Sequence, residues 1–473
     1  MRLTFWGAAE KVTGSMTLLT LDDGYQILID CGIDMSNMAE TDPLYPTSAL
    51  PFDASLVNVV LLSHAHLDHS GKLPNLYKEG FEGQILCTSA TASLTQILLE
   101  DSARINQRKL KAYSKRKSRG LSLDHFNFIP ENLYTTSEVS DTMKEVVPIQ
   151  FKRRFNIKPG VWVTFLPAGH LLGAAHILVE VEEGGVEKSF LFSGDIGRKN
   201  YPLLQDPIEL PQADYVICET TYGNREHSKI DDSTKELQEV IKRACIDIPG
   251  RLIIPAFSIG RTQAVLFELH KLFEEGKLPR IKVFADSPLA MQSNRIYEDF
   301  LYLLNQEAKD FKEDYDSLFN FENIEYAQKQ NDSKAISNYN EPYIIISSSG
   351  MLEGGRIQHH IQANMENPYA TVLMVGFSAE GTLGARLRDN EGYLRIGNED
   401  LKVNCKIEQT DSFSGHGDVN DLQNFIQQQD KNKVTQIFLN HGEEESMVAF
   451  KERIENLGYK NVVIPQKGHE FIV

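Results

Sequence analysis

The chain has 473 residues, of which 41% are hydrophobic, and a formal net charge of −18. This length exceeds one ordinary domain and predicts two or three. The negative charge excludes nucleic-acid binding by overall charge alone, so a bound polyanion must meet a local basic patch or bound cations. No apolar stretch reaches ~18 residues, so no membrane span is expected. The five cysteines are odd in number and form no CxxC pair, which predicts a cytoplasmic protein without disulfides or a thiolate zinc site.

The first 222 residues alternate short β-branched runs with turns, a pattern typical of β-strands. Several runs end in a polar or glycine-rich loop, so functional loops are expected at the strand ends. The expected strands lie within 2–8, 25–32, 57–66, 83–89, 162–170, 176–183, 188–195 and 213–223.

From about residue 223, strands alternate with segments of helical length. A strand, a loop of small residues and a helix follow one another four times, which predicts a parallel α/β sheet. Ligands of such sheets bind at the carboxyl ends of the strands. The expected pairs of strand and helix are 251–257 with 258–276, 280–287 with 288–304, 343–350 with 351–362, and 371–381 with 382–389.

The last segment returns to the first style, with a helix expected at 419–429 and a strand that runs into LNHGEEES. The simplest organisation is one domain interrupted by another. We place the first part of the interrupted domain at 1–222, the inserted domain at 223–402 and the return segment at 403–473.

Three histidines and an aspartate crowd the end of the expected strand at 57–66, in the string SHAHLDHSG. His64 and His66 point to the same side if the strand continues, and Asp68 and His69 follow in the turn. Imidazole and carboxylate ligands suit zinc or a similar divalent ion. Four such residues could serve two ions, and two ions ~3.5–4 Å apart clamp both oxygens of an in-line displacement.

A complete site needs ligands from other strand ends, and three candidates stand out: His170 in LPAGH, Asp195 in FLFSGD and His441 in IFLNHG. A strand-end histidine taken alone is more often solvated or a hydrogen-bonding core residue, and Asp195 alone would suit a turn. Beside the HxHxDH string, all three are expected to bind metal, with Asp195 able to bridge two ions.

Together these motifs resemble those of a known family. SHAHLDHSG, PAGHLLGAAH, FSGDIG and LIDCG resemble the four motifs of the metallo-β-lactamase superfamily. ETTYGN, DSFSGHGD and LNHGEEE resemble motifs A, B and C of the β-CASP nucleases, and the insert is similar to that of bacterial and archaeal relatives of the nuclease subunit of the cleavage and polyadenylation machinery. The resemblance covers almost the whole chain. It implies an α/β fold: a metallo-β-lactamase αββα sandwich interrupted by a β-CASP domain with a mainly parallel sheet flanked by helices.

The resemblance further implies two Zn²⁺ ions per chain, with Mn²⁺ as the alternative metal, and a hydroxide between them that attacks phosphorus. Asp195 would bridge the ions, so it and Asp68 are expected to be catalytic as well as metal-binding. The other implied ligands are His64, His66 and His170 for one ion, and Asp68, His69 and His441 for the second.

Three more residues receive roles from the same resemblance. His416 would be the general acid that protonates the leaving oxygen, and Glu219 would orient it and favour its protonated form. Asp30 would orient a ligand rather than bind metal itself. The resemblance also bears on the substrate. His441 in motif C favours RNA, because the DNA-repair branch of the family has valine at this position. Motif B reads SGHGD where the family commonly has SAHAD, and glycine restricts the backbone beside His416 less than alanine would.

Substrate contacts are expected in two regions. The segment 104–120 carries eight Lys or Arg residues and no acidic residue, and 151–155 adds three more. Either a solvated helical face or a phosphate-binding track beside the cleft explains this charge. In the insert, backbone N–H groups at the start of the helix after 343–350 would grip a phosphate. The expected substrate-binding residues are Ser414, Arg261, Ser348, Ser349, Gly350 and Arg356.

The predicted function is a zinc-dependent RNA phosphodiesterase of RNA processing or decay, acting on single-stranded RNA as an endoribonuclease or a 5′-exoribonuclease. A homodimer is consistent with the family. One alternative is a small-molecule metallohydrolase of thioester or lactam type, and another is a non-catalytic RNA-binding subunit. The long insert, expected to cap the cleft, argues against the first alternative. The complete set of ligand-type residues argues against the second.

Overall fold

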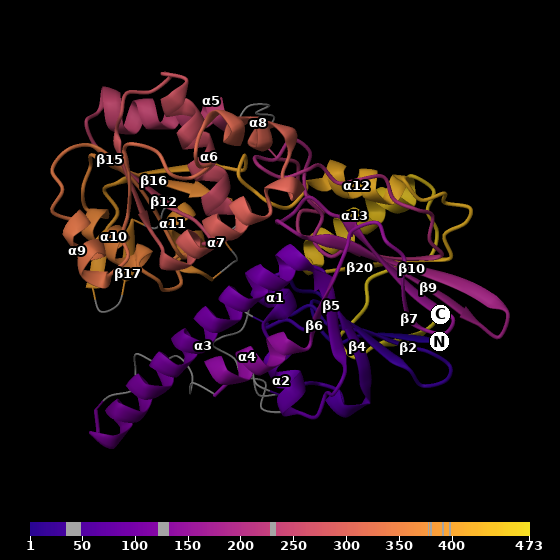
Figure 1. Cartoon of the computed structure of the whole chain (residues 1–473). Helices are drawn as coiled ribbons and strands as arrows, with labels where there is room; N and C mark the ends of the chain where they lie inside the picture. Colours follow the sequence, from indigo (N-terminus) through magenta and orange to yellow (C-terminus); the bar gives the residue numbers. More distant parts are fainter. Residues whose placement is uncertain are drawn as a thin grey trace. The chain divides into compact units, whose positions relative to one another are not determined.

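The computed structural model describes residues 1–34, 49–121, 132–227, 233–376, 378, 381–389, 392–396 and 399–473. They form two compact units (Figure 1). Within these ranges, no helix has both the length and the apolar character needed to cross a membrane. Unit 1 comprises Met1–Lys199, Gln205–Glu226 and His416–Val473, and unit 2 comprises Asn200–Leu204 and His227–Gly415.

Two seven-stranded sheets are found among the described residues of unit 1. All eight strands predicted for residues 1–222 are present, and the sequence patterns missed β2, β6 and β7. The first sheet has the order β22-β1-β2-β3-β4-β5-β6, with strands at Glu470–Ile472, Arg2–Phe5, Thr17–Thr20, Gln26–Ile29, Val57–Leu61, Gln84–Thr88 and Val146–Ile149. The second has the order β21-β20-β11-β10-β9-β8-β7, with strands at Val462–Val463, Gln436–Asn440, Tyr215–Glu219, Val186–Phe192, Ala175–Glu183, Val161–Pro167 and Phe155–Lys158.

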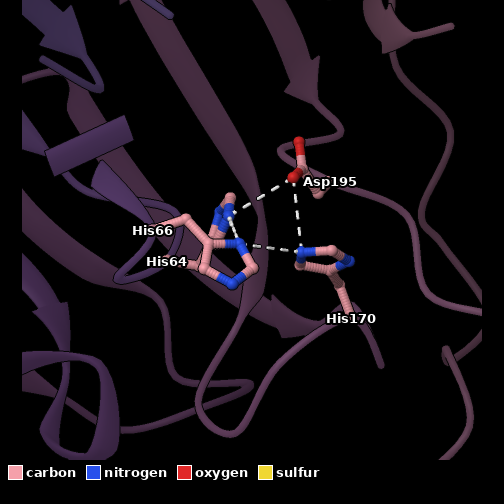
Figure 2. Close-up of side chains that lie close together, drawn as sticks. All are labelled: His64, His66, His170 and Asp195. Atoms are coloured by element: carbon pink, nitrogen blue, oxygen red, sulfur yellow. Dashed lines mark hydrogen bonds and ion pairs between the residues drawn. The ribbon is translucent and has the colours of Figure 1, made fainter. Parts of the chain in front are cut away.

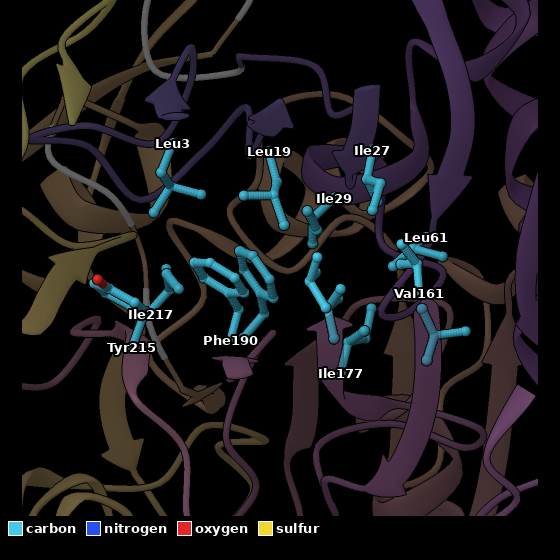
Figure 3. Close-up of a cluster of buried hydrophobic side chains, with 14 of the residues drawn as sticks. Leu3, Leu19, Ile27, Ile29, Leu61, Val161, Ile177, Phe190, Tyr215 and Ile217 are labelled. Atoms are coloured by element: carbon cyan, nitrogen blue, oxygen red, sulfur yellow. The ribbon is translucent and has the colours of Figure 1, made fainter. Parts of the chain in front are cut away.

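The inner faces of the two sheets share one hydrophobic core (Figure 3). Side chains alternate between the faces of a strand, so Tyr215 and Ile217 of β11 enter this core while Val216 and Cys218 point to the outer face. Both faces of β11 are buried, which explains why its sequence reads as a continuous apolar run.

Helices cover both outer faces of unit 1. Leu73 and Leu76 of α2 (Leu73–Lys78) pack with the outer residues of the first sheet, and α12 and α13 pack on the second. The αββα sandwich predicted for this part is therefore confirmed. The helices of unit 1 are α1 (Leu67–Ser70), α2, α3 (Ser89–Ser118), α4 (Thr136–Lys144), α12 (Val419–Gln427) and α13 (Glu444–Asn456), with a 3₁₀ turn at Ala54–Leu56.

Several strands of unit 1 end at the same edge. In the second sheet β10, β11 and β20 are parallel neighbours, and β8 runs in the same direction because both β8 and β10 are antiparallel to β9. In the first sheet β3 and β4 are parallel. The loops that follow these strands hold most of the residues predicted to be functional.

Unit 2 is built on a six-stranded sheet whose neighbouring strands are all parallel, as the repeated strand–loop–helix pattern predicts. Its last strand, β19, pairs with β16, so unit 2 extends beyond the boundary placed at residue 402. The order is β14-β13-β15-β12-β16-β19, with strands at Ile324–Tyr326, Lys282–Asp286, Tyr343–Ser347, Arg251–Pro255, Ala370–Val375 and Lys406–Thr410; a small antiparallel pair joins β17 (Tyr393–Ile396) to β18 (Glu399–Lys402).

One helix of unit 2 begins later than predicted. The helix expected directly after 343–350 starts only at Ile357, because Leu352, Gly354 and Gly355 have positive φ angles that helix residues do not adopt. Phe377, Ala379 and Glu380, in the strand and loop predicted at 371–381, lie outside the described residues. The helices are α5 (Ser233–Ile241), α6 (Arg261–Glu274), α7 (Pro288–Asp299), α8 (Gln306–Asp314), α9 (Gln330–Ile336), α10 (Ile357–Asn364) and α11 (Leu383–Arg388), with a π-helical turn at Lys242–Asp247 and a 3₁₀ turn at Leu301–Leu303.

Candidate active site and metal centre

One group of donor atoms gathers where the loops after β4, β8 and β10 meet (Figure 2). His64 Nε2 and His170 Nε2 each lie 3.3 Å from Asp195 Oδ2. His66 Nδ1 lies 3.1 Å from His64 Nε2 and 3.2 Å from His170 Nε2. Four side chains from three loops therefore present one atom each to a common point.

A second group consists of Asp68, His69 and His441. His69 Nε2 lies 3.1 Å from His441 Nε2, and Asp68 Oδ2 lies 3.5 Å from the same nitrogen. Asp195 Oδ1 lies 3.2 Å from His69 Nε2, whereas Asp195 Oδ2 faces the first group. One carboxylate thus presents a different oxygen to each group, and all seven residues predicted as ligands come together in unit 1.

This donor set fits divalent metal ions. Burial lowers the pKa of His64, that of His66 to about 3, and that of His170 well below its usual value, so these imidazoles are neutral and keep a lone pair for a metal. Asp195 Oδ1 is buried and accepts no hydrogen bond from the described residues. Lone pairs and an unsatisfied carboxylate oxygen at this spacing call for a cation between them. The mixture of imidazole and carboxylate suits zinc.

A carboxylate behind the ligands fixes their orientation. Asp30, in the loop after β3, accepts hydrogen bonds from His69 Nδ1 at 2.7 Å, from Ser63 Oγ at 2.8 Å and from the Ser63 N–H at 2.7 Å. Ser63 Oγ also lies 3.1 Å from His64 Nδ1. These contacts occupy the Nδ1 atoms of both histidines and leave their Nε2 atoms facing the donor groups. Asp30 therefore lies behind the donor groups, in hydrogen-bond contact with His69 and Ser63.

Two of these positions hold unusual backbone conformations. Asp30 has a φ of 60° and His441 a φ of 52°, values that residues other than glycine seldom adopt. Such conformations persist only where the surroundings fix them, and they are common at active sites. Thr221 Oγ1 lies 3.2 Å from His441 Nδ1, which leaves His441 Nε2 directed at Asp68 and His69.

His416 adjoins the metal groups and is held by Glu219. His416 Nδ1 lies 3.0 Å from Glu219 Oε1, and His416 Nε2 lies 3.7 Å from Asp195 Oδ2. The Glu219 carboxylate accepts hydrogen bonds from the N–H groups of Ile196 and Thr221, at 2.9 and 3.0 Å. Burial lowers the pKa of His416, but the charges of Glu219 and Asp195 outweigh this effect and raise it to about 9. An imidazolium is therefore favoured at this position.

The structure explains why glycine occupies position 417 of motif B. The Gly417 N–H donates to Ile196 O at 2.8 Å, which ties the backbone next to His416 to the loop that carries Asp195. A Cβ atom on Gly417 would lie 2.6 Å from the Cβ of Asp421, closer than real Cβ atoms approach. The backbone beside His416 is thus held by a hydrogen bond, and an alanine at 417 would need Asp421 to shift.

The residues predicted to bind substrate all lie in unit 2. Arg261 has its guanidinium 4.9 Å from the Phe257 ring, and Gly350 packs against the same ring. Ser348 Oγ lies 3.4 Å from Ser287 Oγ. Arg261 is the first residue of α6, which follows β12, whereas Ser348, Ser349 and Gly350 lie in the loop after β15. The hydroxyl of Ser349 is buried and has no hydrogen-bond partner among the described residues, and the Ser414 N–H donates to Asp411 O.

The guanidinium of Arg356 is engaged by other groups of unit 2. Arg356 Nη1 donates to Asp286 Oδ1 at 2.7 Å and to Ala327 O at 2.9 Å, and Nη2 donates to Gln328 O at 2.8 Å. His360 on α10 shares the same carboxylate through its Nε2 at 2.7 Å. Through these contacts Arg356 links the start of α10 to Asp286 at the end of β13 and to the backbone at residues 327 and 328.

Sequence reasoning missed Ser63 and Thr221, which hold the ligand histidines from behind. Ser63 directly precedes His64 and Thr221 lies two residues after Glu219, and this nearness in sequence is the signal that could have indicated them. His176, in β9, is buried, and its Nδ1 lies 2.5 Å from Ser193 O.

Comparisons with known proteins agree with this geometry. The chain matches the metallo-beta-lactamase superfamily domain over residues 18–186, the Beta-Casp domain over residues 262–387, and the Zn-dependent metallo-hydrolase RNA specificity domain over residues 400–465. It is 30% identical to Ribonuclease TTHA0252 of Thermus thermophilus, with 95% of each chain covered. It is 29% identical to transcription termination factor FttA of Methanosarcina mazei, covering 95% of this chain and 68% of that protein, and 27% identical to FttA of Methanocaldococcus jannaschii, covering 98% and 70%.

Proposed function

The chain belongs to the β-CASP ribonucleases of the metallo-β-lactamase superfamily, and from this premise we propose that it hydrolyses phosphodiester bonds of single-stranded RNA with two zinc ions. It is a metal-dependent RNA nuclease, a function that fits the three matched domains and the relatives. The number and identity of the metals, the role of each side chain and the single-stranded form of the RNA are the proposed part.

The observation that carries the proposal is the position of Asp195 between two groups of ligands. Its Oδ2 lies 3.3 Å from the nearest nitrogens of one group, and its Oδ1 lies 3.2 Å from His69 of the other. Asp195 would therefore help to hold a metal ion with each of the two groups. Bound divalent ions supply positive charge that polarises a scissile phosphate and activates water for attack on phosphorus.

His416 is the residue we assign to the leaving group. Glu219 binds its Nδ1, so the Nε2–H faces the metal groups, where a leaving oxygen would emerge. As the new bond from water oxygen to phosphorus forms and that water releases a proton to solvent, the bond to the leaving oxygen breaks, and His416 Nε2 gives that oxygen its proton. Glu219 keeps the imidazole charged and oriented before the transfer, because its carboxylate is fixed by two backbone N–H groups.

The segments that follow β12 and β15 are proposed to hold the RNA backbone. Arg261 supplies positive charge, and Ser348, Ser349 and Gly350 supply hydroxyl and N–H donors that suit phosphate oxygens. The N–H groups would act from a loop and not from a helix N-terminus, because α10 begins only at Ile357.

Two further proposals concern the cellular compartment and the oligomeric state of the protein. The five cysteines are all free and buried, which supports work in a reducing compartment such as the cytoplasm. A homodimer is proposed from the resemblance to the family alone. Light scattering of the purified protein tests it, and a monomer mass across the working concentration range would contradict it.

The function is tested by incubating purified protein with 5′-labelled single-stranded RNA and with DNA of the same sequence, with the metal content measured on the same sample. Internal cuts in RNA alone, with about two metals per chain, would establish an endoribonuclease. Release of single nucleotides from the 5′ end would establish the exonucleolytic mode. A metal-loaded protein that cuts no RNA but hydrolyses a thioester or lactam would overturn the proposal, and RNA binding without any hydrolysis would indicate a non-catalytic subunit.

A further inference from the structure

One charged feature of unit 1 has no part in the metal centre. Helix α3 carries seven of the eight Lys and Arg residues of the segment 104–120, and the eighth, Arg119, is its C-cap, within a chain of net charge −18. The sequence is compatible with either a solvated face or a phosphate-binding track. The positions of these side chains around and along the helix distinguish the two explanations.

Five of the eight cations form a single stripe. They follow one another at intervals of three or four residues, so at ~100° per residue they occupy only ~80° of the helix circumference. At ~1.5 Å per residue the stripe is ~22 Å long, with one cation every ~5–6 Å. The basic stripe consists of Arg104, Arg108, Lys111, Lys115 and Arg119.

The basic stripe lies on the side of α3 opposite the one that packs against the described residues of unit 1. The packed side carries Leu99 and Ala103, which are buried with Tyr134 and Val139 of the α4 region. Further along the same side, Asn106 Oδ1 accepts a hydrogen bond from the Leu133 N–H. In Figure 1 the C-terminal half of α3 runs on past α4.

Most of the stripe has no internal counter-charge. Arg104 pairs with Glu100 at 2.6 Å, and the Asp101 carboxylate feels the charges of Arg104 and Arg108, but Lys111, Lys115 and Arg119 form no ion pair with any residue that the structure describes. All five side chains are exposed. Regularly spaced like charges without partners repel one another along a helix, so this arrangement lowers helix stability in the absence of an anion.

The other end of α3 adjoins the metal centre. Thr88, which caps the helix, and Thr91 in its first turn both donate hydrogen bonds to Gly173 O, at 2.7 and 2.9 Å. Gly173 belongs to the loop between β8 and β9 that carries His170. The first cation of the stripe therefore lies ~20 Å along the helix axis from the turn that contacts this loop.

We propose that the basic stripe binds the phosphate backbone of the RNA substrate outside the metal centre and guides the strand toward it. This proposal rests on the proposed ribonuclease function. The occupant is a single RNA strand because the stripe is one residue wide, regularly spaced and made of cations alone, a surface suited to phosphates rather than to bases. The contact is independent of base sequence and requires an RNA long enough to reach from the metal centre to α3.

Two double variants on the same helix test the proposal. Lys111→Gln/Lys115→Gln removes two charges from the stripe, and Lys109→Gln/Lys117→Gln removes two charges from other sides of α3. Lysine and glutamine have similar helix propensities, so both variants keep the helix, which circular dichroism checks. The kcat/KM is measured at several salt concentrations for an RNA of about 40 nucleotides and for one of about six, which reaches only ~10 Å to either side of the scissile bond at ~3.4 Å per stacked nucleotide.

The stripe variant should lose roughly tenfold in kcat/KM on the long RNA at low salt, and the slope of log kcat/KM against log salt should fall by about 1.4. The off-stripe variant should keep most of that slope, and the short RNA should be cut equally by all three proteins. Equal effects of the two variants on the long RNA would overturn the proposal while leaving the ribonuclease function intact. A wild-type protein that cuts neither RNA would instead overturn the proposed function.

Discussion

His416 Nδ1 lies 3.0 Å from Glu219 Oε1, and two backbone N–H groups hold that carboxylate in place. Glu219→Gln removes the charge that favours the imidazolium, so the pKa of His416 should fall from its raised value of about 9. A general acid must be protonated, and activity is lost as the pH rises through its pKa. The basic limb of the kcat/KM profile should therefore move to lower pH. An unmoved basic limb would contradict the pairing of these two residues in catalysis.

His416→Ala tests the acid itself. The variant should keep its metal, because His416 Nε2 is 3.7 Å from Asp195 and is not among the seven predicted ligands. Cleavage should slow by ~10²–10⁴-fold, the usual contribution of a positioned acid. His359→Ala on α10 serves as the control, since it also removes an imidazole but lies in unit 2, and it should cut RNA at the wild-type rate. Unchanged turnover of His416→Ala would exclude the general-acid role.

Asp195→Ala and Asp68→Ala separate a bridging ligand from an ordinary one. Asp195 has an oxygen near each donor group, whereas Asp68 contacts only the second group, through His69 and His441. After gel filtration, elemental analysis should find Asp195→Ala depleted of most metal, and Asp68→Ala should retain about one ion per chain. Both should be inactive. Asp195→Ala with a full metal complement would contradict the bridging role.

These residues could be identified from the sequence because they directly follow apolar strands. His64, Asp195 and His441 each come within three residues of a buried strand that reads as a hydrophobic run, so their positions at one edge follow from strand direction. The hydrogen-bond partners that orient the histidines are harder to predict from the sequence. The contact from Asp30 to His69 spans 39 residues, and that from Thr221 to His441 spans 220, so no local pattern reveals either pair.

The differences in the inserted part have local causes. Leu352 adopts a φ of 64°, which propensity does not predict for leucine and which delays α10. Strand β19 pairs with β16, more than 30 residues earlier, and its polar sequence KIEQT lacks the apolar run that marks the other strands of this sheet. Because the sequence pattern does not mark β19 as a strand of this sheet, it puts the end of the inserted domain at residue 402, before β19.

Asp30→Asn tests the support behind His69. Asp30 Oδ2 accepts from His69 Nδ1 and from Ser63 Oγ, and an amide can serve these donors only in part. Loss of such an orienting carboxylate typically weakens metal affinity or activity ~10–100-fold. Competition with a chelator measures the affinity. Ser63→Ala keeps the bond from His69 to Asp30 and should have the smaller effect; the reverse order would show that Ser63 is the more important support.

Arg356→Ala tests whether Arg356 stabilises unit 2 or binds substrate. The Asp286 side chain is fully buried and accepts hydrogen bonds from Arg356, His360 and Ser333. Removing one partner of a buried charge typically costs ~3–5 kcal/mol, so the melting temperature should fall markedly. Arg395→Ala, which removes an exposed arginine of β17, should change stability by less than ~0.5 kcal/mol. A rise in KM with an unchanged melting temperature would instead support the predicted role of Arg356 in substrate binding.

The same pair predicts how stability responds to acid. Burial raises the pKa of Asp286, but hydrogen bonds from His360, Ser333 and Arg356 outweigh it and hold that pKa below its usual value. A carboxyl with a lowered folded-state pKa contributes stability above its unfolded value of ~3.9, and this contribution disappears as the pH falls through the folded value. The difference in melting temperature between wild type and Arg356→Ala should therefore be full near neutral pH and shrink below about pH 4. Thermal unfolding of both proteins at matched pH measures it, and a difference that grows in acid would show that Arg356 stabilises unit 2 through contacts other than the Asp286 carboxylate.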